Sequence, residues 1–259
     1  VIGKPIKHSL SPEIHNFWLE KYNIKGIYEK MEINQEGLIK LILKVKKREI
    51  NGINVTVPFK KEIIPLVDQL SLEAEITQSV NTICLKDNKI MGYNTDIDGF
   101  NLAMHDTTFD FNNKKILILG AGGVVPSIIY ALNKMKVSEI MVSNRTQKKA
   151  EELKNIFKDL KIVTWGEFSN VDMIINATSL GLDNNDEIKI DFSQIENNKF
   201  FYDVIYNPKE TKFLKNAQKL GHKTENGKKM FIYQAAKAFQ IWHGIQPKIE
   251  DQVIKLLDK

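Results

Sequence analysis

Hydrophobic and polar positions alternate with two different periods over the first hundred residues. The period-two pattern predicts strands at 1–6, 26–33 and 53–59. The helical pattern predicts helices between them, at 11–23 and 35–49. Segment 81–96 predicts a hairpin with its turn near Asp87 and Asn88. This order of elements predicts an α/β domain in which much of the sheet is parallel.

A second series of the same kind occupies the middle of the chain. Apolar runs are strand-like at 114–120, 139–144, 161–165, 171–178 and 199–206, and helical periodicity marks 124–136 and 147–159. Segments 227–244 and 247–258 are helical, and their periodicity does not say which series they complete. We therefore predict an α/β protein of two domains, with the change between residues 97 and 105.

Composition narrows the class of protein. The 259 residues are 42% hydrophobic and 27% charged, which is ordinary for a globular chain. The net charge of +5 is scattered and only two of the 37 basic residues are arginines, so no nucleic-acid partner is expected. No apolar run reaches the ~20 residues that span a bilayer and no secretory signal is visible, which favours a cytoplasmic location. One cysteine, Cys84, and five scattered histidines predict neither a disulfide nor a metal site.

Segment 114–132 combines a strand, a glycine turn and the start of a helix. Such a turn lets backbone N–H groups approach a pyrophosphate at the positive end of the helix. Gly120 and Gly122 fit the pattern, Gly123 is an additional glycine, and Val125 replaces the third glycine. The alternative is a tight turn without a ligand, but the strand that follows favours a nucleotide site.

The end of that following strand carries no acidic residue. NAD enzymes usually place Asp or Glu there, on the ribose 2′-hydroxyl, whereas residues 143–149 read SNRTQKK. Arg145 stands where NADP carries its 2′-phosphate, and a guanidinium binds phosphate in bidentate fashion. The sequence favours NADP over NAD, the alternative being that Arg145 is an ordinary surface charge.

Segment 51–63, NGINVTVPFKKEI, predicts a strand that leads into a helix. Period-two alternation sends Asn54, Thr56 and Pro58 to one face and the apolar residues between them to the core. The polar face then forms the wall of a pocket with Lys60 at its rim. The alternative is a solvent-facing edge strand followed by a surface lysine.

Further polar residues stand at the ends of predicted elements: Ser9, Ser11, Asn81, Asn94 and Asp96. Each has an ordinary explanation, since Ser11 before Pro12 suits a helix N-cap and Asn94 and Asp96 suit a turn or a cap. Neutral donors and acceptors beside an amine and a carboxylate are also what recognition of a polyhydroxylated acid requires.

The order of these motifs resembles the shikimate dehydrogenase family. HSLSP, NVTVPFK, VNT, NTDIDGF, GAGG, NRT, NATSLG, YDVIYNP and QAAKAF follow one another as in that family, over nearly the whole chain. The resemblance implies reversible NADPH-dependent reduction of 3-dehydroshikimate to shikimate, a step of chorismate and aromatic amino-acid biosynthesis. It also implies a substrate-binding domain at 1–100 onto which 227–259 packs back, a Rossmann-like NADP-binding domain at 101–226, and a cleft between them.

The resemblance implies roles for individual residues as well. Lys60 and Asp96 match the catalytic pair. Substrate would be held by Ser9 and Ser11 at its carboxylate and by Thr56, Asn81 and Gln234 at its hydroxyls, with Lys60, Asp96 and Tyr206 nearby. NADP would contact Gly120, Ala121, Gly122, Gly123, Val124, Asn144, Arg145, Thr146, Lys149, Thr178, Val204 and Gly227.

One stretch departs from the family pattern. Val124 and Val125 replace the small residues usual after the glycines, and Pro126 follows in the first helical turn, where proline is tolerated. The valines could shift the cofactor and weaken its binding. Two other functions stay open, an NAD-dependent quinate/shikimate dehydrogenase and a nucleotide-binding relative without turnover. The expected partner is a small-molecule substrate, and the expected state is a monomer or a homodimer.

Overall fold

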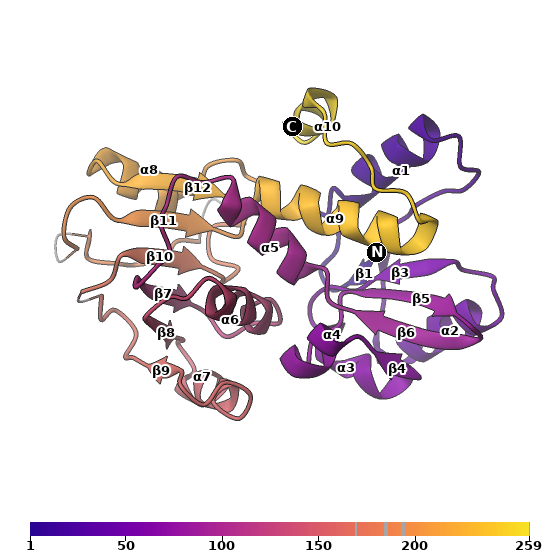
Figure 1. The fold of residues 1–259 in the computed structure, drawn as a ribbon, viewed down its shortest axis with the longest axis horizontal. Coiled ribbons are helices and arrows are strands. Elements are labelled where there is room, and N and C mark those ends of the chain that lie inside the picture. Colours follow the sequence, from indigo (N-terminus) through magenta and orange to yellow (C-terminus); the bar gives the residue numbers. More distant parts are fainter. Residues whose placement is uncertain (169, 184–185, 193–194, 259) are drawn as a thin grey trace. The chain divides into compact units, whose positions relative to one another are not determined.

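The chain forms two compact units, Val1–Gly99 together with Ile232–Lys259, and Phe100–Phe231. The computed structural model describes residues 1–168, 170–183, 186–192 and 195–258. Helices α5 (Asp96–His105) and α9 (Lys228–His243) each contribute residues to both units (Figure 1).

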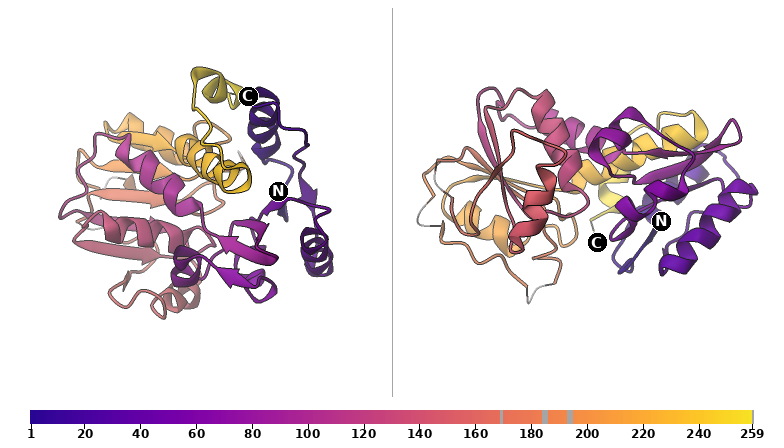
Figure 2. Two further views of the ribbon diagram at one scale, coloured as in Figure 1. Left: turned by 45° about the vertical axis from the view of Figure 1, so that its right-hand side comes forward. Right: turned by 90° about the horizontal axis from the view of Figure 1, so that it is seen from below.

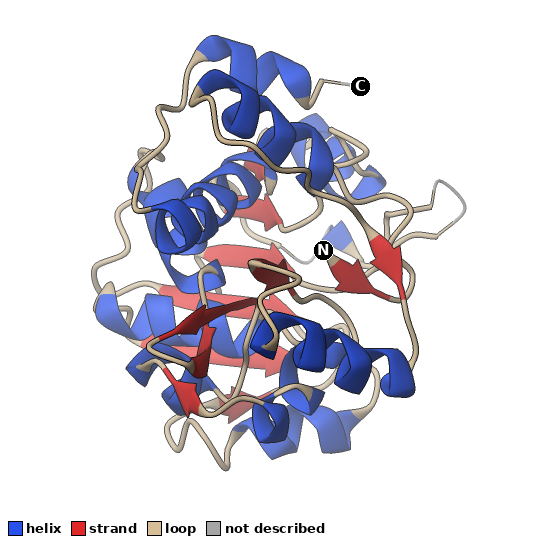
Figure 3. Ribbon diagram, turned by 90° about the vertical axis from the view of Figure 1, so that its right-hand side faces the viewer, coloured by secondary structure: helices blue, strands red, loops and turns tan. Residues whose placement is uncertain are grey.

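The first unit contains two small sheets with helices packed on them. Its other elements are β1 (Ile2–Gly3), α1 (Ser11–Lys21), β2 (Met31–Glu32), α2 (Gln35–Lys46), β3 (Gly52–Asn54), α3 (Phe59–Glu62), η1 (Ile64–Leu66), β4 (Gln69–Leu70), α4 (Leu72–Thr77), β5 (Thr82–Lys86), β6 (Lys89–Tyr93) and α10 (Asp251–Leu256). β1 and β2 form a parallel pair near the N-terminus (Figure 3), and the larger sheet has the order β3-β5-β6-β4. In the larger sheet β3–β5 and β5–β6 are antiparallel, so the prediction of a largely parallel sheet is wrong for this unit.

The hairpin predicted for segment 81–96 is confirmed. β5 and β6 pair antiparallel, and Asp87 and Asn88 between them have φ values of 50° and 59°. Short polar side chains tolerate this left-handed region, and two in succession suit a two-residue hairpin. This tight connection makes the sheet antiparallel, because parallel neighbours need a longer crossover.

The strand predicted over 53–59 is shorter than expected. β3 ends at Asn54, after which the chain pairs with β1, where Thr56 N donates to Ile2 O at 2.9 Å. This change of partner interrupts the two-face alternation. Val57 is consequently 54% exposed instead of lying in the core.

Helix α9 packs over β3 and β5 in the first unit (Figure 1). The indole of Trp242 lies on Gly52, and its Nε1 donates to Ile83 O at 3.0 Å. Phe239 packs against Trp18 of α1, with ring centroids 5.5 Å apart. These aromatic contacts tie the C-terminal part of α9 to the first sheet and to α1.

The second unit is built on a six-stranded parallel sheet of order β12-β11-β10-β7-β8-β9 (Figures 1 and 2). Its elements are β7 (Lys115–Leu119), α6 (Val125–Lys134), β8 (Glu139–Ser143), α7 (Gln147–Leu153), β9 (Lys161–Ile162), β10 (Met173–Asn176), β11 (Phe200–Asp203), α8 (Lys212–Lys219) and β12 (Lys223–Asn226). The strand order reverses between β7 and β10. Ligands of open α/β sheets bind at such a switch point, outside the carboxyl ends of the strands.

Successive residues of the central strands face opposite helical layers. Leu117 of β7 and Phe201 of β11 share a core with Phe213 of α8. Tyr202 points to the other face and packs edge-on against Phe100 of α5, with centroids 5.7 Å apart. Helices on both faces explain why the central strands are continuous apolar runs.

Candidate active site

Lys60 and Asp96 form a buried ion pair in the first unit. Lys60 Nζ, on α3, donates at 2.5 Å to Oδ2 of Asp96, the first residue of α5. The two residues are only 8% and 6% exposed, so the prediction that Lys60 lies at a rim is wrong, as is the alternative of a surface lysine. Burying two charges is costly, and close pairing with further hydrogen bonds offsets that cost.

Asn81, just before β5, holds the other carboxylate oxygen of Asp96. Its Nδ2 donates to Asp96 Oδ1 at 2.9 Å, and its Oδ1 accepts from Thr95 N at 2.8 Å. Asn94 Oδ1 accepts from Asp96 N at 3.2 Å, as expected for a turn residue. The structure thus brings together three of the predicted site residues, Lys60, Asn81 and Asp96.

Asn54 is buried, and its amide is committed to protein groups. Its Nδ2 donates to Asn81 O at 3.1 Å and to Thr82 Oγ1 at 3.0 Å, and its Oδ1 accepts from the Tyr28 hydroxyl at 2.6 Å. The polar face predicted for the strand is therefore partly internal. Tyr28 was missed because nothing in its local sequence indicates a partner 26 residues away.

Ser9 and Ser11 lie side by side at the start of α1. Ser9 Oγ donates to Ser11 Oγ at 3.2 Å and accepts from Ser11 N at 3.3 Å. The N-cap of α1 is Leu10, so the alternative that Ser11 is the N-cap is wrong. Two adjacent hydroxyls suit a carboxylate, and that role stays a prediction.

The remaining predicted substrate residues belong to different units. Thr56 and Gln234 lie in the first unit and are half-buried, Gln234 on α9. Tyr206 lies in the second unit, where its ring stacks on Phe231 with centroids 4.1 Å apart. Their contacts with a substrate stay predictions.

The glycine turn follows β7 at the switch point of the sheet. Gly120 has φ of +110°, and a Cβ there would come within 2.8 Å of Ala177 O, so this path requires glycine. Ala121, Gly122 and Gly123 continue the turn to α6. The N-cap Val124 makes no side-chain hydrogen bond to the helix, and a helix start of this kind suits an anion.

The two valines after the glycines have different surroundings. Val125 and Pro126 are buried inside the unit. Val124 is half-buried at the turn itself. The departure from the family pattern therefore places one bulky side chain, that of Val124, beside the predicted cofactor path.

Arg145 is exposed in the loop after β8, where a 2′-phosphate is predicted. Asn144 Nδ2 donates to Thr146 O at 2.8 Å within this loop, and Lys149 is exposed on α7. Among the described residues no carboxylate forms an ion pair with Arg145. The guanidinium is therefore available to a phosphate, as the choice of NADP requires.

A buried carboxylate ties the loops that follow β10 and β11. Asp203 Oδ1 accepts from Asn176 Nδ2 and from Ile205 N, both at 3.0 Å, and Oδ2 accepts from Thr211 Oγ1 at 2.6 Å. Desolvation raises the pKa of Asp203 to about 6, while these hydrogen bonds act to lower it. Thr178 donates its hydroxyl to Asn176 Oδ1 at 2.7 Å.

Sequence reasoning missed Asn176 and Asp203. Each is the last residue of a wholly buried strand, MIIN and FFYD. A polar residue that ends an apolar run just before a loop was the available signal, because buried polar groups need partners.

Val204 and Gly227 are in direct backbone contact. A Cβ on Gly227 would come within 2.1 Å of Val204 O and 2.5 Å of Val204 C. Gly227 N also donates to Ile205 O at 3.1 Å. Glycine is what lets the chain entering α9 approach the loop after β11 so closely.

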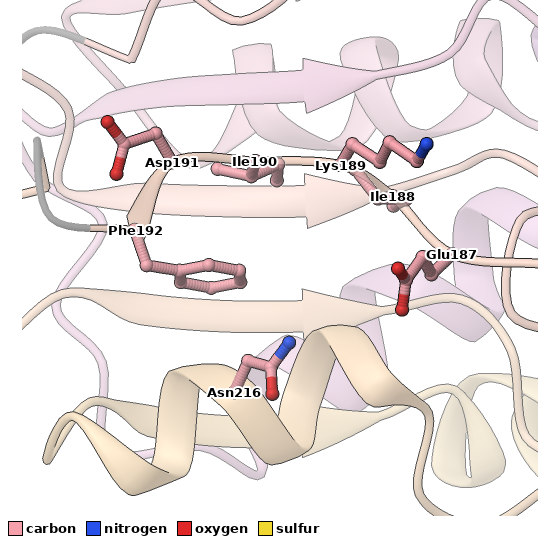
Figure 4. Close-up of a pocket in the computed structure, with 7 residues that line it drawn as sticks. All are labelled: Glu187, Ile188, Lys189, Ile190, Asp191, Phe192 and Asn216. Atoms are coloured by element: carbon pink, nitrogen blue, oxygen red, sulfur yellow. The ribbon is translucent and has the colours of Figure 1, made fainter.

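A separate surface pocket lies in the second unit (Figure 4). It is lined by Glu187, Ile188, Lys189, Ile190, Asp191, Phe192 and Asn216. None of the predicted site residues lines it. Within the described ranges, no group of three or more His, Cys, Asp or Glu side chains could hold a metal ion, and no helix is long and apolar enough to cross a membrane.

The fold and the two sites define a class of protein. A parallel sheet with a glycine turn at its switch point is typical of dinucleotide-binding proteins. A buried lysine paired with a carboxylate can exchange a proton with a substrate oxygen. Together these features are typical of a dinucleotide-dependent oxidoreductase.

Comparison with known proteins gives the family. The model "Shikimate dehydrogenase substrate binding domain" matches residues 1–83, "Shikimate / quinate 5-dehydrogenase" matches 101–210, and "Shikimate 5'-dehydrogenase C-terminal domain" matches 229–253. Shikimate dehydrogenase (NADP(+)) of Pelagibacter ubique (strain HTCC1062) is 58% identical over 258 residues, which cover 100% of this chain and 97% of the relative. The chain belongs to the shikimate dehydrogenase family.

Solved structures are similar over the same length. Shikimate dehydrogenase from Aquifex aeolicus has a TM-score of 0.90 and 39% identity, covering 99% of this chain and 95% of that chain. Shikimate 5-dehydrogenase from Thermus thermophilus, in complex with NADP(H) and shikimate, has a TM-score of 0.89 and 31% identity, covering 99% and 96%.

Proposed function

We propose that the chain catalyses the reversible NADPH-dependent reduction of 3-dehydroshikimate to shikimate, a step of chorismate and aromatic amino-acid biosynthesis. The observation that carries the proposal is the buried Lys60–Asp96 pair, whose carboxylate is held by Asn81. The family and the names of the relatives support the same substrate and cofactor. In this proposal the first unit binds the substrate and the second unit binds NADP.

Lys60 acts as the acid in the direction of reduction. When bound, NADPH supplies a hydride to the substrate's carbonyl carbon. The carbonyl oxygen then carries negative charge and takes a proton from Lys60 Nζ, which makes the product hydroxyl. Asp96 accepts hydrogen bonds from Lys60 and Asn81, and so fixes the direction in which Nζ points. In the oxidation, the neutral amine of Lys60 takes that proton back.

The residues of the second unit fit NADP. The backbone path at Gly120 excludes a Cβ, and the turn leads to a helix start without a side-chain cap. Arg145 would pair with the 2′-phosphate, with Lys149 nearby on α7. Val204 and Gly227 would border the nicotinamide.

The assay that tests the proposal is reduction of NADP with shikimate, run beside quinate and beside NAD. We expect turnover with shikimate and NADP that exceeds the other three combinations. Faster turnover with quinate and NAD would instead support a quinate/shikimate dehydrogenase. Binding of NADPH without any turnover would indicate a nucleotide-binding relative.

Ser11→Ala should raise the Michaelis constant for shikimate more than it lowers turnover. The hydroxyl would bind the carboxylate equally in ground state and transition state, and loss of such uniform binding leaves turnover largely unchanged. Steady-state kinetics measure both constants. The matched control is Ser71→Ala, because Ser71 is a true N-cap whose Oγ accepts from Ala74 N at 3.2 Å. That control should cost about 1 kcal/mol of stability without changing the constant. An unchanged constant in Ser11→Ala would remove Ser11 from the substrate site.

Arg145→Ala should weaken NADP binding by about 1.5–3 kcal/mol, the usual worth of a hydrogen bond to a charged group. NAD binding should not change, because NAD lacks the 2′-phosphate. Calorimetric titration with each dinucleotide measures the difference. Lys158→Ala, at an exposed lysine of the same unit, is the control for charge alone. Equal loss of NAD and NADP binding in Arg145→Ala would contradict the assignment.

The cytoplasmic location and the monomeric or homodimeric state stay predictions. Cell fractionation tests the first, and light scattering of the purified protein tests the second.

A further inference from the structure

The loop after β11 is held by the buried carboxylate of Asp203. This side chain is fully buried and accepts hydrogen bonds from three different segments. The donors are Asn176 at the end of β10, Ile205 N in the loop itself, and Thr211 at the N-cap of α8. A single group therefore fixes the position of the loop against the neighbouring strand and the following helix.

Asn176 holds the loop after β10 in the same way. Its Oδ1 accepts from Thr178 N at 3.0 Å, and its Nδ2 donates to Leu180 O at 3.2 Å as well as to Asp203. Both the oxygen and the nitrogen of the Asn176 side-chain amide are thus hydrogen-bonded within the protein. The two loops share one connected network, and displacing either side chain would release both.

In each of these loops a backbone carbonyl group lies in close contact with a glycine. Ala177 O lies 2.8 Å from the place of a Cβ on Gly120, and Val204 O lies 2.1 Å from that of Gly227. Both contacts are between backbone atoms, so they leave little freedom for a shift. The positions of these two backbone segments beside the switch point therefore depend on the hydrogen-bond network that holds the loops.

The strand order indicates which part of a dinucleotide these loops would contact. The glycine turn follows β7 and Arg145 follows β8, so the pyrophosphate and the 2′-phosphate would lie over these two strands. A dinucleotide spans the switch point, with its two halves over the two halves of the sheet. The remaining half would therefore extend over the carboxyl ends of β10 and β11.

We propose that Asp203 and Asn176 are positioning residues that hold the loops after β10 and β11 in place for the nicotinamide half of NADP. The proposal rests on the proposed function for the identity of the dinucleotide. Neither side chain touches a reacting atom. They act through the loops, whose misplacement by about 1 Å can cost about a hundredfold in rate.

The test compares two ligands that share the adenosine half. Binding of NADPH and of adenosine 2′,5′-bisphosphate, which lacks the nicotinamide, is measured for the wild type and for Asp203→Ala. We expect the dissociation constant of NADPH and the turnover to worsen by about ten- to a hundredfold. The dissociation constant of the bisphosphate should stay at the wild-type value.

Three further substitutions keep the test decisive if Asp203→Ala does not fold. Thr211→Val removes the 2.6 Å bond to Asp203 and should give the same split between the two ligands, in weaker form. Thr211→Ser keeps the hydroxyl and should restore wild-type values. Ala217→Gly, on the same helix α8, lowers stability without touching the network and should change neither affinity.

The outcomes separate a positioning role from a merely structural one. Parallel loss of both ligands, or a lower melting temperature with unchanged affinities, would overturn the proposal. The binding measurements need no substrate, so they do not depend on the reaction assigned to the enzyme. Absence of shikimate turnover in the wild type would contradict the proposed function and leave the ligand split as a separate result.

Discussion

Lys60→Met lowers turnover by about two to four orders of magnitude, the usual worth of general acid–base catalysis. Methionine keeps the apolar stem and removes the only group on this side chain that can give a proton to the substrate oxygen. NADPH binding should stay at the wild-type value, because the residues proposed to bind the nucleotide lie in the second unit. Steady-state turnover and fluorescence titration of NADPH measure the two quantities.

The same substitution should also destabilise the protein. Asp96 would keep its bond from Asn81 but lose its charged partner in a buried place, and breaking a buried pair costs about 3–5 kcal/mol. The double variant Lys60→Met with Asp96→Asn removes both charges and should recover much of that stability. Its turnover should stay low, which separates the loss of chemistry from the loss of folding.

Lys61→Ala is the matched control for Lys60. Lys61 is the next residue of α3 but is exposed, so its loss should change neither turnover nor stability. Turnover near the wild-type value in Lys60→Met would mean that another group supplies the proton. Equal loss in both variants would point to a general effect of charge on α3.

Gly227→Ala should cut turnover by about a hundredfold and weaken NADPH binding. The new Cβ would meet the O, C and Cα of Val204 at 2.1, 2.5 and 3.0 Å, and backbone atoms have no alternative rotamer. The start of α9 and the loop after β11 must therefore move apart, and a displacement of about 1 Å is enough for a loss of this size. Overpacking of this kind also costs about 1–3 kcal/mol of stability.

Two other glycines serve as controls for that substitution. Gly221→Ala places a Cβ in open space but at φ of +80°, so it reports the cost of backbone strain alone. Gly26→Ala has an ordinary φ and only a 3.9 Å contact with Leu19. Wild-type turnover in Gly227→Ala, with a loss of stability like that of Gly221→Ala, would show that the close contact has no part in catalysis.

Sequence patterns located the strands of the second unit better than those of the first. The central strands β7 and β10 are covered on both faces and therefore appear as continuous apolar runs. The edge strand β12 reads KTEN and has no such run, and the lysine-rich helix α8 that precedes it was also missed. In the first unit the sequence predicted the two-residue hairpin. It did not predict the pairing of β3 with β5, because that pairing depends on contacts that local periodicity does not describe.

The candidate site shows the same limit. The resemblance pointed to Lys60, Asn81 and Asp96, and the structure places these three in one network. Their burial could not be read from the segment around Lys60, because the partner that neutralises it lies 36 residues away. Asn54 illustrates the reverse case, since a polar residue predicted to face a ligand instead bonds across to β5 and Tyr28.

The order in which the two units can complete their cores during synthesis follows from the contribution of α9 to the first unit. Residues 1–99 leave the ribosome long before Phe239 and Trp242, the aromatic residues that cover Trp18 and Gly52. The second unit is continuous in sequence, so it can complete its core first, although domains usually fold from the N-terminus during synthesis. Proteolysis of stalled nascent chains would show the second unit protected before the first. The earliest residues to be made would then be among the last to reach their final packing.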